Sequence, residues 1–281
     1  LTFTMCIAII ALGVHAQPPA GKLSASDSVQ VNEYWKKANK VRLFSQARQA
    51  YLDSALAIMP WNAYYWQQKA MPLSKQMKHE LAQPYLDSAV KYNPKKYLDY
   101  RGYMNCIFRK NYRDALTDFY AAKTLNGNSG VMDHPYDFYI GLCHLQLNSF
   151  DSARVYFQKS IDEKTKLHGS AWVHPLHWFY LSVTDNELGN ADIAMQHIDT
   201  CLKMNPTFPD AWYVKAEYLE DRKQYKDALA AALKADSLLQ KGYSMNEDGG
   251  RYEHYPYGLN RYYLAGTISW LQKEAATGID K

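Results

Sequence analysis

Three histidines of this chain have a spacing that could bind a metal ion. His174 and His177 are three positions apart at the expected start of a helix, and His168 is nearby. Two histidines at this spacing can hold a metal on one helix face. However, no acid or cysteine stands at ligand spacing, and a His-Pro pair at 134–135 holds the same place in the preceding segment as the pair at 174–175. We therefore expect these histidines to cap helices or to lie on the surface, and we predict neither a metal nor a cofactor.

Three acids could also act together. Glu217, Glu220 and Asp221 share one face of an expected helix. They could be a catalytic pair of carboxylates, a solvated face, or part of a groove that meets basic groups on a partner. The sequence contains none of the motifs of phosphate-binding loops, dinucleotide-binding folds, zinc proteases or serine hydrolases. We predict that the protein is not an enzyme.

The overall composition is that of a folded protein. The chain has 281 residues, of which 47% are hydrophobic and 21% charged, and this balance excludes disordered and fibrous classes. The net charge of +4, without a basic run, gives no sign of nucleic-acid binding. Cys106, Cys143 and Cys201 form no Cys-x-x-Cys pair. We expect them to pack as small hydrophobic residues rather than to form disulfides or a metal site.

The N-terminal residues have the pattern of a secretory signal. Residues 5–14 are uncharged and apolar but too few to span a bilayer, and small residues followed by a proline-rich stretch come next. We expect residues 1–16 to be a signal peptide and residues 17–28 a linker, with a buried N-terminal helix as the alternative. No other segment predicts a transmembrane helix. The protein is then exported, and is periplasmic or secreted in a Gram-negative bacterium.

A sequence repeat of about 34 residues organises the rest of the chain. The segment 51–60 returns as 85–94, and a third copy covers 197–206. Each copy has one anchor residue. An apolar residue follows it after four positions and a small residue after seven, so that all three lie on one face of a helix. The anchors themselves are Arg48, Ala82, Ala115, Ala153, Ala194 and Ala228.

A second helical pattern precedes each anchor. Trp66, Trp178 and Trp212 stand sixteen residues before their alanines, and Lys69 and Lys215 follow the first and last of these tryptophans. The two patterns together resemble the tetratricopeptide repeat family, with its pattern W-x2-L-G-x2-Y…A-x3-F…P, although the two lysines replace the expected leucine. The composition is similar to that of exported proteins of the Bacteroidetes type.

The resemblance implies an all-α, right-handed superhelical α-solenoid of about six helix pairs. A Tyr- and Gly-rich loop at 241–258 and a capping helix at 259–276 then follow the last pair. The pairs are expected at about 29–60, 61–94, 95–127, 134–165, 174–206 and 209–240.

In this family the first helix of each pair lines an inner groove, so the resemblance places the binding residues there. The inward positions are Gln67, Met71, Tyr103, Phe138, Leu142, Phe179, Val183, Tyr213 and Glu217. We expect this stripe to bind a partner, unless the protein's own tail or loop covers it. The implied function is a non-enzymatic protein–protein interaction scaffold that binds a peptide or a partner protein. The alternative is a glycan-associated module of an outer-membrane uptake system, with tyrosine and tryptophan rings as stacking platforms.

Overall fold

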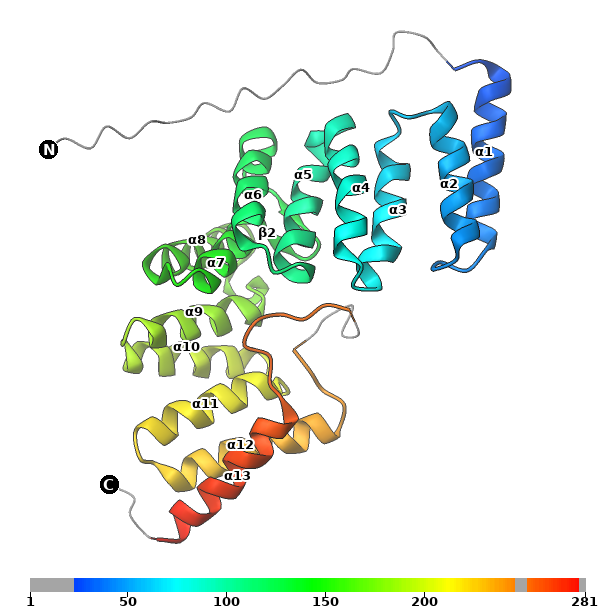
Figure 1. Ribbon diagram of the computed structural model, residues 1–281. Coiled ribbons are helices and arrows are strands. Elements are labelled where there is room, and N and C mark those ends of the chain that lie inside the picture. The colour runs from blue at the N-terminus through cyan, green and yellow to red at the C-terminus, as the bar shows by residue number, and fades with distance from the viewer. Residues whose placement is uncertain (1–22, 246–251, 278–281) are drawn as a thin grey trace, which may run out of the picture. The chain divides into compact units, whose positions relative to one another are not determined.

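The computed structural model describes residues 23–245 and 252–277 (Figure 1). The expected signal peptide lies outside these residues. The described part forms two compact units, which divide between Tyr97 and Leu98. No helix in the described ranges has the length and apolar character that crossing a membrane requires.

The first unit consists of two helix pairs. Its helices are α1 (Ala25–Lys40), α2 (Gln46–Ile58), α3 (Ala63–Lys75) and α4 (His79–Tyr92), and α1 packs on α2 as α3 packs on α4. The side chain of Ser24 accepts a hydrogen bond of 2.9 Å from the backbone N–H of Asp27 and so caps α1. The helix therefore starts inside the stretch 17–28 that the sequence predicts as a linker, and that prediction is wrong for residues 25–28.

The second unit carries the remaining pairs. Its helices are α5 (Pro94–Tyr103), which begins in the first unit and continues as a π-helix (Met104–Phe108), α6 (Tyr112–Asn126), α7 (Tyr136–Gln146), α8 (Phe150–His168), α9 (Pro175–Glu187), α10 (Ala191–Met204), α11 (Pro209–Asp221), α12 (Tyr225–Gln240) and α13 (Arg261–Ala276). Helices α7 and α8, α9 and α10, and α11 and α12 pack as pairs, and α13 packs on α12. The described residues thus form six helix pairs and a closing helix, as the repeat pattern predicts.

Two connections differ from the sequence prediction. Helix α8 runs to His168, three residues beyond the expected end of its repeat, and a short 3₁₀ turn (Ser170–Trp172) leads to α9. The connection before α7 contains the two-residue strands β1 (Gly130–Val131) and β2 (His134–Pro135), which pair antiparallel. Pro135 therefore precedes α7 as its N-cap, whereas Pro175 lies in the first turn of α9.

Small residues let the two helices of a pair approach each other. A Cβ added to Gly141 of α7 would lie 3.0 Å from the ring of Phe157 on α8, and one added to Gly102 would lie 3.1 Å from Phe119. The alanine anchors of the second helices are buried as well. This close approach is the physical reason for the regular spacing of small residues in the sequence.

Candidate functional site

A non-helical stretch of the chain, with a turn at Pro256 and Tyr257, lies on one face of the second unit. Residues 252–259, here called the covering segment, run between α12 and α13 along the side of α5, α7, α9 and α11 (Figure 1). Each of the four helices has a residue that interacts with the covering segment, and so does the turn that follows α5. Helix α9 also contacts Met245, which precedes the segment in the chain. We call this side the inner face of the second unit.

The inner face holds the covering segment partly through its backbone. The hydroxyl of Tyr180 on α9 donates a hydrogen bond of 2.8 Å to the carbonyl oxygen of Pro256. The ammonium group of Lys110 donates another to the carbonyl oxygen of His254. Backbone carbonyls are present in every peptide, so these two contacts do not depend on which side chains the bound chain carries.

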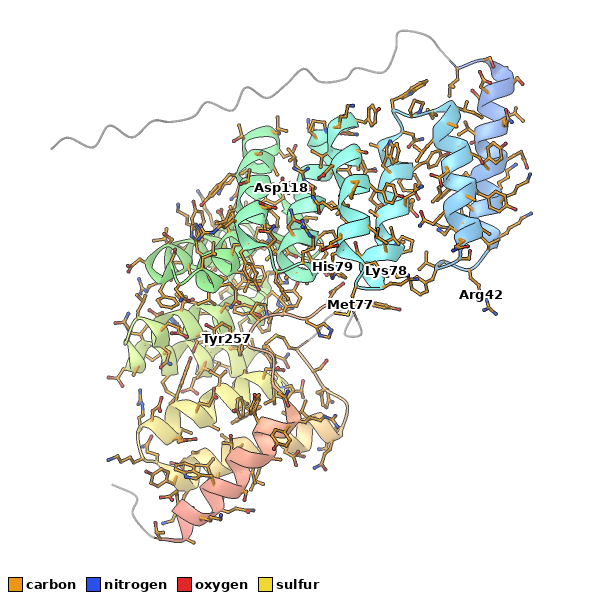
Figure 2. The ribbon with its side chains drawn as sticks, viewed as in Figure 1. Arg42, Met77, Lys78, His79, Asp118 and Tyr257 are labelled. Atoms are coloured by element: carbon orange, nitrogen blue, oxygen red, sulfur yellow. The ribbon has the colours of Figure 1, made fainter. Side chains whose placement is uncertain are left out.

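Three side chains of the covering segment add further contacts. Tyr255 is buried and hydrogen-bonds with Tyr139 on α7, and Glu253 hydrogen-bonds with Tyr103 on α5. The hydroxyl of Tyr257 donates a hydrogen bond of 3.1 Å to Glu187 at the end of α9, and Figure 2 shows Tyr257 beside the described helices of this unit.

Burial raises the pKa of the inner tyrosines well above the ordinary value. The effect is seen for Tyr103, Tyr139 and Tyr180, and in each case burial is the largest cause. These hydroxyls therefore stay protonated at any physiological pH. They remain able to donate a hydrogen bond to a chain that lies on them.

A buried acid fixes the end of the covering segment. Oδ1 of Asp210, at the start of α11, accepts a hydrogen bond of 2.6 Å from the backbone N–H of Leu259. The backbone N–H of Met245 also interacts with this carboxylate. Burial raises the pKa of Asp210, while the two N–H groups act in the opposite direction. One side chain thus joins both ends of the loop that contains the covering segment.

Four of the predicted groove residues belong to the core instead. Phe138, Leu142 and Phe179 have 0% exposed surface and Val183 has 4%. The prediction that they bind a partner is therefore wrong in this structure. The physical reason is the helical register, because successive side chains point about 100° apart around the helix axis. The residues that contact the covering segment are the next ones in the sequence, Tyr139 and Tyr180.

The ring of Phe138 shows what these buried positions do. It stacks on His134 with ring centroids 4.1 Å apart and on His177 at 4.7 Å, and it also contacts Phe157 and Tyr180. These contacts join α7, α8 and α9. Such a ring stabilises the stacking of neighbouring repeats and has no surface left for a ligand.

Three other predicted positions have different surroundings. Tyr103 lies on the inner face as predicted, but it is buried and the covering segment contacts it. Gln67 and Met71 lie on α3 of the first unit and are half-buried. No interaction with a partner can be read from their geometry, so their role in binding stays a prediction.

The last two predicted positions, Tyr213 and Glu217, lie beside an open hollow. It has a volume of about 460 Å³ and lies between α11 and α13. The Tyr213 hydroxyl is 3.5 Å from Oγ1 of Thr267 across the hollow. We call this hollow the α11–α13 pocket, and its lining residues are Tyr213, Glu220, Tyr262, Tyr263, Gly266, Thr267 and Trp270.

The acids of α11 are electrostatically coupled. The pKa of Glu217 is raised to about 7, chiefly by burial and also by Glu220 and Asp221, while a hydrogen bond with Tyr213 acts in the opposite direction. The side chain of Glu217 still reaches solvent. Burial likewise raises the pKa of Glu220, with Asp221 as a second cause. Three carboxyl groups close together disfavour full ionisation, and a cation among them would restore it.

The histidines form a buried cluster rather than a surface group. Nδ1 of His134 is 3.2 Å from Nε2 of His177, whose Nδ1 is 2.8 Å from the hydroxyl of Ser160. His134 and His177 are buried, so the expectation of surface or capping histidines is wrong for His177, whereas His168 is exposed. His174 does cap α9, since its Nδ1 accepts from the backbone N–H of Leu176. Within the described ranges, no three His, Cys, Asp or Glu side chains are arranged to hold a metal ion.

The three cysteines pack in the core, as the sequence predicts. Cys106, Cys143 and Cys201 are free thiols with no exposed surface. The Sγ atoms of Cys106 and Cys143 lie 3.6 Å apart, which is a packing contact. Burial raises the pKa of the Cys143 and Cys201 thiols, so neither is an activated nucleophile.

Comparison with known proteins supports the repeat fold. Residues 187–240 match the family model described as tetratricopeptide repeat. No protein with a curated description is a significant sequence match. The fold is similar to that of the Cut9–Hcn1 hetero-tetramer of the APC/C, with a TM-score of 0.58 and 12% identity over 87% of this chain and 46% of that chain. This chain therefore spans less than half the length of that protein.

Two bacterial structures match over nearly their whole length. PilF of Pseudomonas aeruginosa has a TM-score of 0.54 and 16% identity, over 81% of this chain and 95% of that chain. A tetratricopeptide repeat protein from Parabacteroides merdae has a TM-score of 0.50 and 14% identity, over 89% of this chain and 100% of that chain. At these identities the likeness establishes the fold alone.

Proposed function

We propose that this chain, which has the fold of tetratricopeptide repeat proteins and matches their family model at residues 187–240, is a protein–protein interaction scaffold whose inner face binds an extended peptide of a partner protein. The fold itself is that of an interaction scaffold. The finer part of the proposal, namely the inner face of the second unit and the extended form of the ligand, rests on the contacts of the covering segment.

One observation carries the proposal. The inner face already holds a non-helical stretch of chain, through hydrogen bonds from Tyr180 and Lys110 to the backbone carbonyls of Pro256 and His254. Donors placed in this way recognise the main chain, and neighbouring pockets for side chains supply the specificity. A partner peptide would use the same donors after it displaces the covering segment. The stacked repeats would keep those donors in place.

The test empties the inner face while the chain keeps its length. In the emptied variant, residues 252–258 are replaced by a glycine–serine stretch of seven residues. A synthetic peptide of residues 252–258 should bind this variant in a calorimetric titration, and a peptide of the same composition in scrambled order should bind more weakly. Tyr180→Phe in the emptied variant removes one donor and should weaken binding about fivefold.

A capture experiment then connects the inner face to a partner. Immobilised wild type and the emptied variant are exposed to an extract of the native host. A partner of the inner face should be retained more strongly by the emptied variant, and free 252–258 peptide should release it. Equal binding of both peptides to the emptied variant, or a captured protein that the peptide does not release, would contradict the proposal.

We further propose that the protein acts outside the cytoplasm, in the periplasm or secreted, after removal of residues 1–16. The apolar stretch at 5–14 and the small residues after it support this proposal. Mature protein from the native host should begin at Gln17 by N-terminal sequencing. A soluble cytoplasmic protein that retains Thr2 or Met5 would contradict it.

A further inference from the structure

The α11–α13 pocket is an open hollow on the second unit, and no residue of the covering segment lines it. One wall comes from α11, with Tyr213 and Glu220, and the other comes from α13. The rings on α13 are unusually exposed, with 83% of Tyr262, 66% of Tyr263 and 40% of Trp270 accessible. Large rings in water at this level mark an interaction surface rather than a core.

The helical spacing of α13 presents these rings together. Positions 262, 263, 266, 267 and 270 lie on one side of the helix, because residues four apart are neighbours on a helix surface. Gly266 and Thr267 between the rings are small, and a Cβ added to Gly266 would meet nothing within 4 Å. The rings therefore border a hollow and do not close over it. Trp270 is held in place by an edge-to-face contact with Tyr225, at 5.6 Å between centroids.

The opposite wall is acidic. Of the residues that line the pocket, Glu220 alone is acidic or basic, and Glu217 and Asp221 lie near it on α11. A carboxylate opposite aromatic rings attracts a cation from both sides, by ion pairing and by the negative faces of the rings.

The chain itself shows which group fits between an acid and a ring. Lys215 bonds Asp199 at 2.6 Å and lies 5.7 Å above the ring of Trp212. Lys69 pairs with Asp53 and lies 4.6 Å above Tyr85, and Lys123 pairs with Asp137 and lies 6.0 Å above Tyr156. Each of these sites consists of an acid, an aromatic ring and a basic side chain. The α11–α13 pocket supplies the first two from its own lining.

We propose that the α11–α13 pocket binds an arginine or lysine side chain of the partner protein. The inference rests on the proposed scaffold function, because it assigns the chemistry of the partner at the end of the same inner face. The occupant is cationic rather than apolar because an apolar side chain would leave Glu220 without solvent or a partner. It is cationic rather than a sugar because Glu220 lines one wall, with Glu217 and Asp221 near it on α11, and a neutral sugar would compensate none of this charge.

The experiment uses the full chain labelled with ¹⁵N and two synthetic peptides. One is acetyl-Gly-Arg-Gly-Arg-Gly-amide, and the other has citrulline, which is neutral and nearly the same shape, at both arginine positions. The signal is the indole N–H resonance of Trp270, assigned by its loss in Trp270→Phe. The arginine peptide should shift this resonance and bind about tenfold more tightly than the citrulline peptide.

Matched variants connect the binding to the pocket. Glu220→Gln should weaken binding of the arginine peptide about fivefold. Asp227→Asn removes an acid from α12, outside the pocket, and should leave the affinity within about twofold. Tyr262→Ala removes a ring that is mostly in water, so the fold is kept, and it should also weaken binding about fivefold.

Three results would overturn the inference. One is equal affinity for the two peptides, and a second is an unchanged Trp270 resonance at saturating arginine peptide. The third is a shift of Trp270 by maltotriose or chitotriose without one by the arginine peptide, which would make the pocket a sugar platform. None of these results depends on the peptide of residues 252–258, so a failure here is distinguishable from a failure of the proposed function.

Discussion

Tyr180 on α9 donates a hydrogen bond of 2.8 Å to the carbonyl oxygen of Pro256, a residue 76 positions further along the chain. The same hydroxyl lies 3.7 Å from the sulfur of Met245. One buried tyrosine is thus in contact with residues before and within the loop that leads to the last helix. The repeats and the covering segment are therefore joined in one packed structure, although long stretches of chain separate them.

Replacing this tyrosine should loosen the covering segment. Tyr180→Phe keeps the ring but leaves the carbonyl of Pro256 without its donor, and should cost about 1 kcal/mol of stability. Amide hydrogen exchange should become faster at residues 252–259, and chemical denaturation should show the lower stability. Tyr243→Phe removes a hydroxyl from an exposed ring and is the control. Equal exchange rates in wild type and Tyr180→Phe would show that this hydrogen bond does not hold the segment.

Replacing a helical glycine by alanine should lower the stability of the protein at Gly141 and raise it at Gly266. A Cβ at Gly141 meets the ring of Phe157 at 3.0 Å, so Gly141→Ala should overpack the crossing of α7 and α8 and cost about 1–3 kcal/mol. A Cβ at Gly266 meets nothing, and Gly266→Ala should raise the stability by about 0.5–1 kcal/mol through helix propensity. Thermal unfolding of both variants checks the pair. A stabilised Gly141→Ala protein would contradict the close crossing.

A buried charge cluster joins α5, its π-helical extension and α6. Removing one of its charged side chains should lower the stability of the protein. Asp118 accepts hydrogen bonds of 3.0 and 2.6 Å from Arg101 and one of 3.1 Å from Asn105, and Figure 2 marks Asp118 on α6. Asp118→Ala removes both of these hydrogen bonds from the half-buried guanidinium of Arg101, and should cost about 3 kcal/mol in urea unfolding. The double variant Arg101→Met with Asp118→Leu should recover part of that loss. A double variant no more stable than the single one would contradict an electrostatic origin.

The stability should depend on pH through Glu217. Its pKa rises from 4.5 to about 7 on folding, so the folded chain binds more protons than the unfolded chain between these values. This contribution is complete below pH 4.5 and is lost as the pH rises through 7. Since the side chain also reaches solvent, screening limits it to about 1 kcal/mol. Glu217→Gln should be as stable as the wild type at pH 4.5 and about 1 kcal/mol more stable at pH 8.

Unfolding curves at the two pH values provide the test of that difference, with Asp227→Asn as the control. A stability difference between Glu217→Gln and wild type that is the same at both pH values would contradict it. The carboxyl resonance of Glu217, followed by NMR through the same pH range, measures the pKa directly.

The departures from the family pattern became clear only in three dimensions. Lys69 and Lys215 stand where the family has leucine, and nothing in the sequence around them explains the change. In the structure each one bonds an acid sixteen residues earlier, Asp53 and Asp199 respectively, and lies over an aromatic ring. An apolar position has become an ion pair between adjacent helices.

The sequence by itself determined the helix pairs, their number in the described residues and the small residues at their crossings. These features repeat every 34 residues or so, and the periodicity of a helix is local, so spacing alone reveals them. Only the tertiary structure decided which side chains face outward. The sequence predicted Phe138 and Phe179 on the inner face, but the residues found there are their neighbours Tyr139 and Tyr180, one position further along each helix. The covering segment has no periodic pattern, and its place follows from contacts between residues far apart in the chain, which no local spacing encodes.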